Sequence, residues 1–342
     1  MKNKNIVTIG GGTGSFMLLS GLKKYQVDLS AIVSMADDGG STGVLRDELG
    51  VLPPGDVRQC LVALSDSSEI LRKLLSYRFE EGGLKGHNFG NLFLSTLEKI
   101  SGSFEIGIEE AIKILNVKGK IIPVTNDDAR IFLKLKNGNI LKGEDNINKS
   151  EIIQKDGFEK LYFEPAVKAS QKAIQHILEA DLILIGPGGF YTSILPNLLA
   201  FGISEAINNS KAIVIYNCNL TNKKGQTDGF SLDDYAKEVN AYMGKDRLDF
   251  VIYNSKKPDE KLIEKYQSQQ QQLVEFDPGE NKNRTYKVIS ADVLSDEISE
   301  YGSADVIAST RALIRHDSNK LAKAIFLVSE MENYKNIIKD II

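Results

Sequence analysis

Apolar and polar positions follow one another along the chain in the order strand, turn, helix. Residues 5–9 are mostly apolar and precede a glycine-rich run at 10–14, after which apolar side chains recur at helical spacing through 15–22. A second apolar run at 29–35 predicts another strand, and residues 36–43 are too polar and glycine-rich for a regular element, so they predict a loop. The start of the chain therefore predicts a β-α-β unit.

Helical patterns follow this unit. Pro53 and Pro54 predict the start of a helix through Leu64, because proline is tolerated in a first helical turn. Further amphipathic stretches predict helices near 69–77, 91–100 and 108–115.

From residue 120 to about 163 the pattern changes to short alternating segments. Apolar runs at 131–133 and 140–141 flank an Asn-Gly turn at 136–139, which is typical of a β-hairpin. The polar stretch at 142–156 predicts an excursion over the surface. Strand-like runs then alternate with helical patterns and predict a mostly parallel sheet; these runs are 182–185, 212–216 and 250–253. We therefore expect an α/β fold with an inserted β-rich excursion at 120–163.

Composition narrows the class of protein. The 342 residues are 42% hydrophobic and 26% charged, which excludes disordered, fibrous and collagen-like chains. A net charge of -4 gives no positive field for nucleic acid. No apolar run approaches a membrane span, and the run Ile6–Ile9 is too short for a signal peptide, so we expect a cytoplasmic protein.

Cysteine and histidine offer no recognisable catalytic arrangement. Cys60 and Cys218 are too far apart in the sequence to form a metal-binding pair, and Cys60 lies on the apolar face of its expected helix, which predicts a core position. His87, His176 and His316 lack the spacing of a zinc site.

The first candidate site is the glycine turn after the first strand. Glycine allows backbone N–H groups to approach a phosphate closely, and the following helix contributes its positive end. The turn consists of Gly10, Gly11, Gly12, Thr13 and Gly14. It has serine where a dinucleotide fingerprint has its third glycine, and it lacks the Gly-Lys-Ser/Thr of a P-loop. A tight turn without a ligand is the structural alternative.

Two acids follow the second strand. Asp37 lies 23 residues after Gly14, where dinucleotide folds place an acid that binds a ribose. Together with Asp38 it could instead hold a divalent cation that bridges to phosphates. Asp-Gly turn chemistry is the alternative for Asp38. Three neighbours complete this candidate loop: Gly39, Ser41 and Thr42.

Two further sets of candidate residues lie in loops, one before an expected helix and one after expected strands. His87, Asn88 and Asn91 surround a helix start, and His87 is either a ligand contact, an acid or base, or a structural hydrogen-bonder. A second set follows later strands: Gly186, Pro187, Gly188, Tyr191, Thr192, Ser193, Asn217 and Asn219. Ligands bind along the carboxyl edge of parallel sheets, so we expect all of these near a nucleotide. The catalytic residues stay unknown, with Asp38 and His87 as candidates. The chain shows no Ser-His-Asp order, GxSxG elbow or reactive-cysteine context.

These motifs resemble the YvcK-type gluconeogenesis factors, part of the CofD-like group that includes the 2-phospho-L-lactate transferases. The resemblance spans nearly the whole chain. It rests on Ile9–Gly14, Asp37–Gly43, Leu52–Arg58, Gly86–Asn91, Gly186–Gly188, Tyr191–Leu199 and Arg315–Asp317. Gly189-Phe190 departs from the Ser-Leu usual in the family, so no side-chain hydroxyl is available at position 189.

The resemblance implies a single Rossmann-like α/β domain over 1–342 that binds a UDP-sugar without an established reaction. It also implies a cytoplasmic role in cell shape and in growth on gluconeogenic carbon sources. Envelope or regulatory proteins and a second copy of the chain are the expected partners. The alternative is a transferase that uses a nucleotide-activated phospho-acid and Mg²⁺ held by Asp37 and Asp38. An NAD-dependent oxidoreductase is a third reading.

Overall fold

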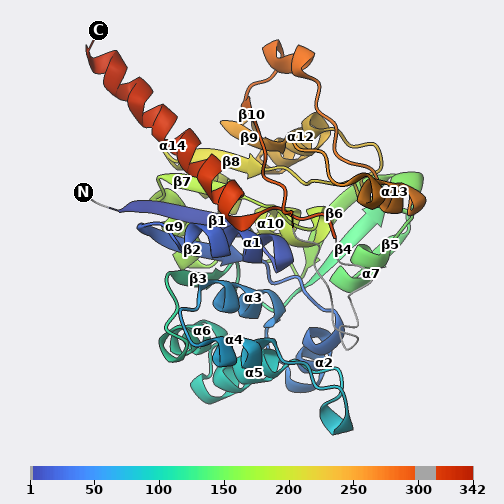
Figure 1. Ribbon diagram of the computed structural model, residues 1–342. Coiled ribbons are helices and arrows are strands. Elements are labelled where there is room, and N and C mark those ends of the chain that lie inside the picture. The colour runs from blue at the N-terminus through green and yellow to red at the C-terminus, as the bar shows by residue number, and fades with distance from the viewer. Residues whose placement is uncertain (1–2, 297–312, 342) are drawn as a thin grey trace.

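A parallel sheet forms the centre of the computed structural model, which describes residues 3–296 and 313–341 (Figure 1). Within these residues the sheet has seven strands in the order β10-β9-β8-β7-β1-β2-β3, all parallel. The strands are β1 (Lys4–Gly10), β2 (Val27–Val33), β3 (Lys120–Pro123), β7 (Leu182–Ile185), β8 (Ile213–Asn217), β9 (Phe250–Asn254) and β10 (Lys287–Ala291). The predicted α/β fold with a parallel sheet is confirmed, and β10 is a strand that the sequence analysis missed.

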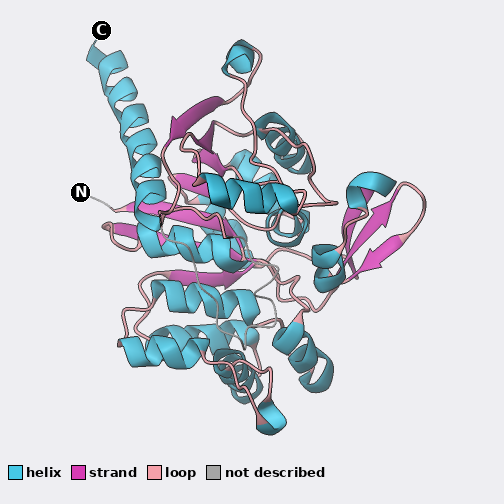
Figure 2. Ribbon diagram, turned by 45° about the vertical axis from the view of Figure 1, so that its right-hand side comes forward, coloured by secondary structure: helices cyan, strands magenta, loops and turns pink. Residues whose placement is uncertain are grey.

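Helices cover both faces of the sheet (Figures 1 and 2). The connection from β1 to β2 runs across the sheet in the opposite direction to that from β7 to β8, so right-handed crossovers place their helices on opposite faces. On one face α1 (Gly12–Leu22) packs against α3 (Gly55–Leu64) and α14 (Ser318–Ile341). On the other, α11 (Ile203–Asn209) packs against α9 (Gln171–Leu178) and α12 (Leu232–Met243).

The other helices are α2 (Gly40–Leu49), α4 (Glu69–Ser76), α5 (Phe89–Ser101), α6 (Phe104–Ile114), α10 (Leu195–Leu199) and α13 (Glu260–Ser268), and π-helix η2 (Phe190–Ile194) precedes α10. Helices α4, α5 and α6 confirm predicted stretches, whereas no range was predicted for α10 or α13. The loop expected after β7 contains η2, and the loop predicted at 36–43 is wrong from Gly40 onward because α2 begins there. Glycine, serine and threonine in its first turn have low helix propensity, but they suit a helix start.

The inserted segment forms a separate antiparallel sheet beside the main body (Figure 2). Its order is β5-β4-β6, from β4 (Arg130–Leu135), β5 (Ile140–Lys142) and β6 (Phe158–Glu164), which confirms the hairpin. Two expectations need correction. Residues 120–123 belong to the main sheet as β3, and the stretch 142–156 contains the short helices α7 (Glu144–Lys149) and α8 (Ile153–Asp156), each with one fully buried isoleucine.

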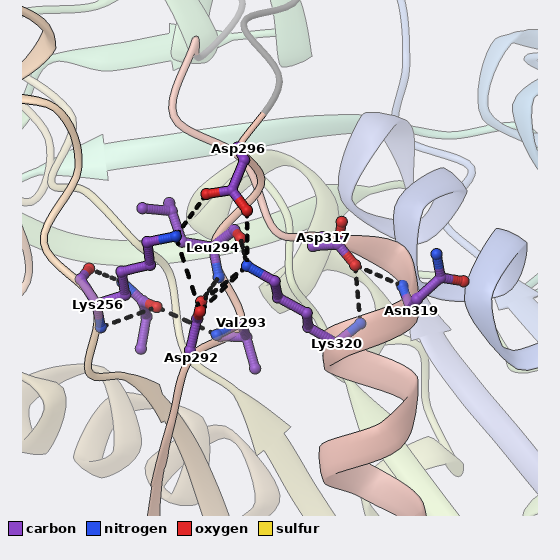
Figure 3. Close-up of polar contacts among 9 residues, drawn as sticks. Lys256, Asp292, Val293, Leu294, Asp296, Asp317, Asn319 and Lys320 are labelled. Atoms are coloured by element: carbon purple, nitrogen blue, oxygen red, sulfur yellow. Dashed lines mark hydrogen bonds and ion pairs between the residues drawn. The ribbon is translucent and has the colours of Figure 1, made fainter.

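The far edge of the main sheet is joined to α14 by alternating charges (Figure 3). Lys320 in the first turn of α14 donates to Asp292 and Asp296, and Lys256 after β9 pairs with the same two carboxylates. Asp317 accepts hydrogen bonds from backbone N–H groups in that first turn. Lys4–Gly10 and Leu182–Ile185, at the centre of the sheet, are buried mainly among apolar side chains. Among the described residues, no helix combines the length and apolar character needed to cross a membrane.

Candidate functional site

The two predicted glycine turns meet at the carboxyl edge of the sheet. Strands β1 and β7 are neighbours from which the chain departs in opposite directions, the arrangement that leaves a crevice for ligands in open α/β sheets. A Cβ on Gly14 would overlap the carbonyl oxygen of Pro187 and lie 3.0 Å from the nitrogen of Gly188. Gly12 has a φ of +64°, a conformation that glycine adopts without strain, and α1 begins there. Thr13 and Gly14 lie in the first turn of α1.

A carboxylate of the protein itself lies in the first glycine turn. The N–H of Gly12 donates to Asp56, and a Cβ on Gly11 would overlap an oxygen of the same carboxylate. Asp56 is in the first turn of α3, where the sequence offered one signal, an acid after Pro-Pro-Gly at a helix start. The sequence analysis did not propose it as a site residue. Any anion that binds this turn therefore approaches a buried carboxyl group.

Asp37 lies beside Asp56. Its Oδ1 accepts a hydrogen bond from the N–H of Gly39 at 3.0 Å, and its carboxyl is also bonded to Thr42. A Cβ on Gly55 would overlap Asp37, which shows how closely α3 approaches this loop. Burial raises the pKa of Asp37, and burial together with the charge of Asp37 raises the pKa of Asp56 to about 7.

Asp38 points toward the insertion. Its Oδ1 accepts a hydrogen bond from the N–H of Asp145 at 2.9 Å, and its Oδ2 pairs with Arg130 at 3.4 Å. The neighbouring Glu144 begins α7, and burial with the charges of Asp37, Asp56 and Asp38 raises its pKa well above the usual value. The sequence analysis missed Glu144 because it treated this polar stretch as surface.

The other end of α7 is held by the loop after β8. Gln226 donates from Nε2 to the carbonyl oxygens of Ile147 and Asn148, both at 2.9 Å, and Lys223 donates to Asn148. Burial lowers the pKa of Lys223 to about 8, although the charge of Glu144 opposes this change. Helix α7 therefore bridges the loop of β2 and the loop of β8.

His87 and Asn88 have local structural partners. His87 shares a 3.3 Å contact between Nδ1 and the Oγ of Ser41, the same hydroxyl that accepts the N–H of Asn88 at 3.3 Å. The side chain of Asn88 is the N-cap of α5 and accepts the N–H of Asn91 at 3.2 Å. Asn91 in turn accepts from Nε of Arg58 at 3.0 Å.

Two asparagines at the end of β8 and just after it form hydrogen bonds with the second glycine turn. Asn217 donates from Nδ2 to the carbonyl oxygen of Gly186 at 3.1 Å, and Asn219 donates to that of Gly188 at 2.9 Å. Both amide donors are thus committed to backbone. Tyr191 is buried with its ring 5.2 Å from that of Phe158 in the insertion.

Thr192 and Ser193 both carry a hydroxyl just before α10, and that of Ser193 lies nearer the first glycine turn. A Cβ on Gly12 would be 3.8 Å from the Oγ of Ser193, whereas a Cβ on Gly189 would overlap the buried Thr192 hydroxyl. The site therefore brings together the glycines, Asp37, Asp56, Glu144 and Ser193.

The cysteines and histidines that the sequence did not favour as site residues lie in other parts of the fold. Cys60 is fully buried in the core as predicted, and burial raises its pKa. His176 contacts Ser30 on β2, and burial lowers the pKa of His316 to about 4. Within residues 3–296 and 313–341, no group of three or more His, Cys, Asp and Glu side chains is arranged to hold a metal ion.

The fold is that of a doubly wound α/β protein, and the candidate site lies at the switch point between β1 and β7. Residues 6–294 match the family of 2-phospho-L-lactate transferase CofD. The gluconeogenesis factor of Bacillus subtilis is 38% identical over 322 residues, which cover 94% of this chain and 96% of that protein. The gluconeogenesis factor of Halalkalibacterium halodurans is also 38% identical, over 327 residues, which cover 95% and 96%.

A solved structure agrees with these matches. A member of the UPF0052 family from Bacillus halodurans superposes with a TM-score of 0.86 at 37% identity, covering 95% of this chain and 99% of that one. The chain belongs to the CofD family and, within it, to the gluconeogenesis factors. The resemblance stated from the sequence motifs is confirmed.

Proposed function

We propose that the protein binds a UDP-sugar at the switch point between β1 and β7. The observation that carries the proposal is the contact of the two glycine turns, Gly10–Gly14 and Gly186–Gly188, at the start of α1. Backbone N–H groups at a helix start bind phosphates well. Asp37, in the loop after the neighbouring strand β2, is the acid expected from the sequence to bind ribose hydroxyls, as in folds of this kind.

Binding would serve regulation. We infer a cytoplasmic factor that links the level of a nucleotide sugar to cell shape and to growth on gluconeogenic carbon sources. The name of the relatives, gluconeogenesis factor, supports the metabolic part of this inference. A sensor of this kind passes its signal to a partner, for which envelope or regulatory proteins and a second copy of the chain are the candidates.

The second candidate function is a transferase that uses a nucleotide-activated phospho-acid and a divalent cation. The raised pKa values of Asp37, Asp56 and Glu144 favour it, because a cation would relieve the repulsion among these carboxylates. Asp37 and Asp56 fit the cation better than Asp37 and Asp38, since Asp38 is bonded to the insertion. Two carboxylates with substrate phosphates are a usual Mg²⁺ environment.

Thermal shift and calorimetry distinguish these functions. The ligands are UDP-sugars, GDP, NAD and NADP, each with Mg²⁺ or with EDTA. A sensor is supported when a UDP-sugar alone raises the unfolding midpoint and EDTA changes nothing. Loss of binding in EDTA, with Mg²⁺-dependent release of a nucleoside monophosphate from a nucleotide-activated phospho-acid, supports the transferase. No shift with any UDP-sugar contradicts the first proposal, and selective binding of NAD would favour an oxidoreductase.

A further inference from the structure

The side chain of Arg58 crosses the first turn of α5 at Gly90. A Cβ on Gly90 would lie 2.7 Å from Cδ and 2.9 Å from Cγ of Arg58, and 2.5 Å from the carbonyl oxygen of Leu75. These separations are shorter than van der Waals contact, so a side chain at position 90 would displace the arginine or the backbone of α4. The side chain of Arg58, on α3, therefore explains why glycine stands at position 90 of the motif Gly86–Asn91.

The guanidinium group of Arg58 is oriented by a neutral side chain, the amide of Asn91. Nε of Arg58 donates to Oδ1 of Asn91 at 3.0 Å, and Nδ2 of Asn91 is 3.4 Å from the Oγ1 of Thr42. Asn91 is buried, so its amide cannot swing freely between partners. A hydrogen bond at Nε fixes the plane of a guanidinium group, and its direction is then set before a ligand arrives.

Arg58 also lies close to the first glycine turn. It is in the first turn of α3 with Asp56, the carboxylate that accepts the N–H of Gly12. The charge of Arg58 lowers the pKa of Asp56, against the larger effects of burial and of Asp37. The guanidinium group of Arg58 is thus linked through Asn91 and Thr42 to Asp37, and its charge acts on Asp56, the carboxylate of the first glycine turn.

We propose that Arg58 recognises the diphosphate of the ligand, and that Gly90 and Asn91 are positioning residues for it. The inference rests on the proposed binding of a nucleoside diphosphate. A guanidinium presents paired N–H donors that match two phosphate oxygens, which neither an imidazole nor an amide does. The motif around His87 thus contributes to binding through the arginine that it holds.

Calorimetric titration with UDP and UMP tests this role. We expect Arg58→Gln to lower the affinity for UDP by about ten- to a hundredfold, the range for a lost charge-assisted hydrogen bond, and to lower the affinity for UMP less. Arg58→Lys recovers part of the UDP affinity, because it keeps the charge but not the paired donors. Gly90→Ala also lowers the ratio of UDP to UMP affinity, as Arg58→Gln does. Arg72→Gln is the control, since Arg72 donates to the carbonyl oxygen of Ser67, which is not a residue of the candidate site.

The outcomes separate this inference from the proposed function. An Arg58→Gln variant that is folded and keeps the wild-type ratio of UDP to UMP affinity overturns the inference and leaves UDP binding standing. If the wild type binds neither nucleotide, the proposed function fails, and inorganic pyrophosphate becomes the probe. Binding of pyrophosphate by the wild type and not by Arg58→Gln then supports anion recognition by Arg58. Equal binding by both, or none by the wild type, overturns it.

Discussion

Replacing Asp56 by asparagine should stabilise the protein at neutral and alkaline pH. The carboxylate is buried beside Asp37, which raises its pKa to about 7 from a usual value of 3.8. The folded state therefore binds a proton more tightly than the unfolded state does, so the contribution of this group to stability falls as the pH rises from about 4 through about 7. Asparagine keeps an acceptor oxygen for the N–H of Gly12 but carries no charge.

The two pKa values of Asp56 set the size of the effect. A pKa difference of one unit corresponds to about 1.4 kcal/mol, so the ionised Asp56 destabilises the folded state by on the order of 4 kcal/mol at alkaline pH. Between pH 5 and pH 8 the gain in stability from Asp56→Asn should grow by about 2–3 kcal/mol.

Urea unfolding in EDTA at these two pH values measures the difference between the variant and the wild type. EDTA is included because a divalent cation bound by the carboxylates would itself stabilise the ionised form. Asp246→Asn is the control for removal of a carboxylate, since Asp246 is exposed in the turn before β9 and is not one of the buried acids Asp37, Asp56 and Glu144. A gain from Asp56→Asn that is equal at pH 5 and pH 8, or larger at pH 5, would refute the raised pKa of Asp56 that burial and the charge of Asp37 cause.

Substitutions at three other residues of the glycine turns and the loops beside them, Gly14, His87 and Asp37, test the contacts there. Gly14→Ala should destabilise the protein by about 1–3 kcal/mol in urea unfolding, because its Cβ would overlap the backbone of the second glycine turn, whereas Gly83→Ala, with open space around it, should change stability by less than about 0.5 kcal/mol. His87→Ala should weaken UDP-sugar binding by no more than about 1–3 kcal/mol in calorimetry, and a complete loss would contradict its local structural role. If Asp37 binds ligand hydroxyls, Asp37→Asn should weaken UDP-sugar binding less than Asp37→Ala does, and the reverse order in the same titration would count against that contact.

Much of the fold could be predicted because its signals are local. The apolar runs of β1 and β7 are followed directly by glycine turns, and parallel strands bring such turns to one edge. Strand β10 was missed because it is an edge strand in which no residue is buried. The apolar pattern of such a strand is weak. The start of the insertion was placed too early, since Lys120–Pro123 is short and looks like the alternating segments after it.

The candidate site could be predicted only where its residues follow a strand. Glycine turns and Asp37 carry that signal, but Asp56 enters the site from a helix start, and Glu144 enters from an insertion with its own small sheet. Their proximity depends on tertiary contacts, such as the approach of Gly55 to Asp37, that no spacing along the chain reveals. Sequence position alone also suggested that Asp38 acts with Asp37, whereas the structure turns its carboxylate toward Arg130.

The acidic side chains of the candidate site restrict how a diphosphate can bind. Asp37, Asp56 and Glu144 already disfavour one another's ionised forms, and a diphosphate would add further negative charge close to Asp56. Binding must therefore bring compensation: protons taken up by the carboxylates, a divalent cation between them and the phosphates, or a guanidinium in reach of both. In the role proposed above, Arg58 would provide the last of these without any change in protonation. The sensor and the transferase thus differ physically in which positive charge accompanies the nucleotide, and the same acidic residues are compatible with either.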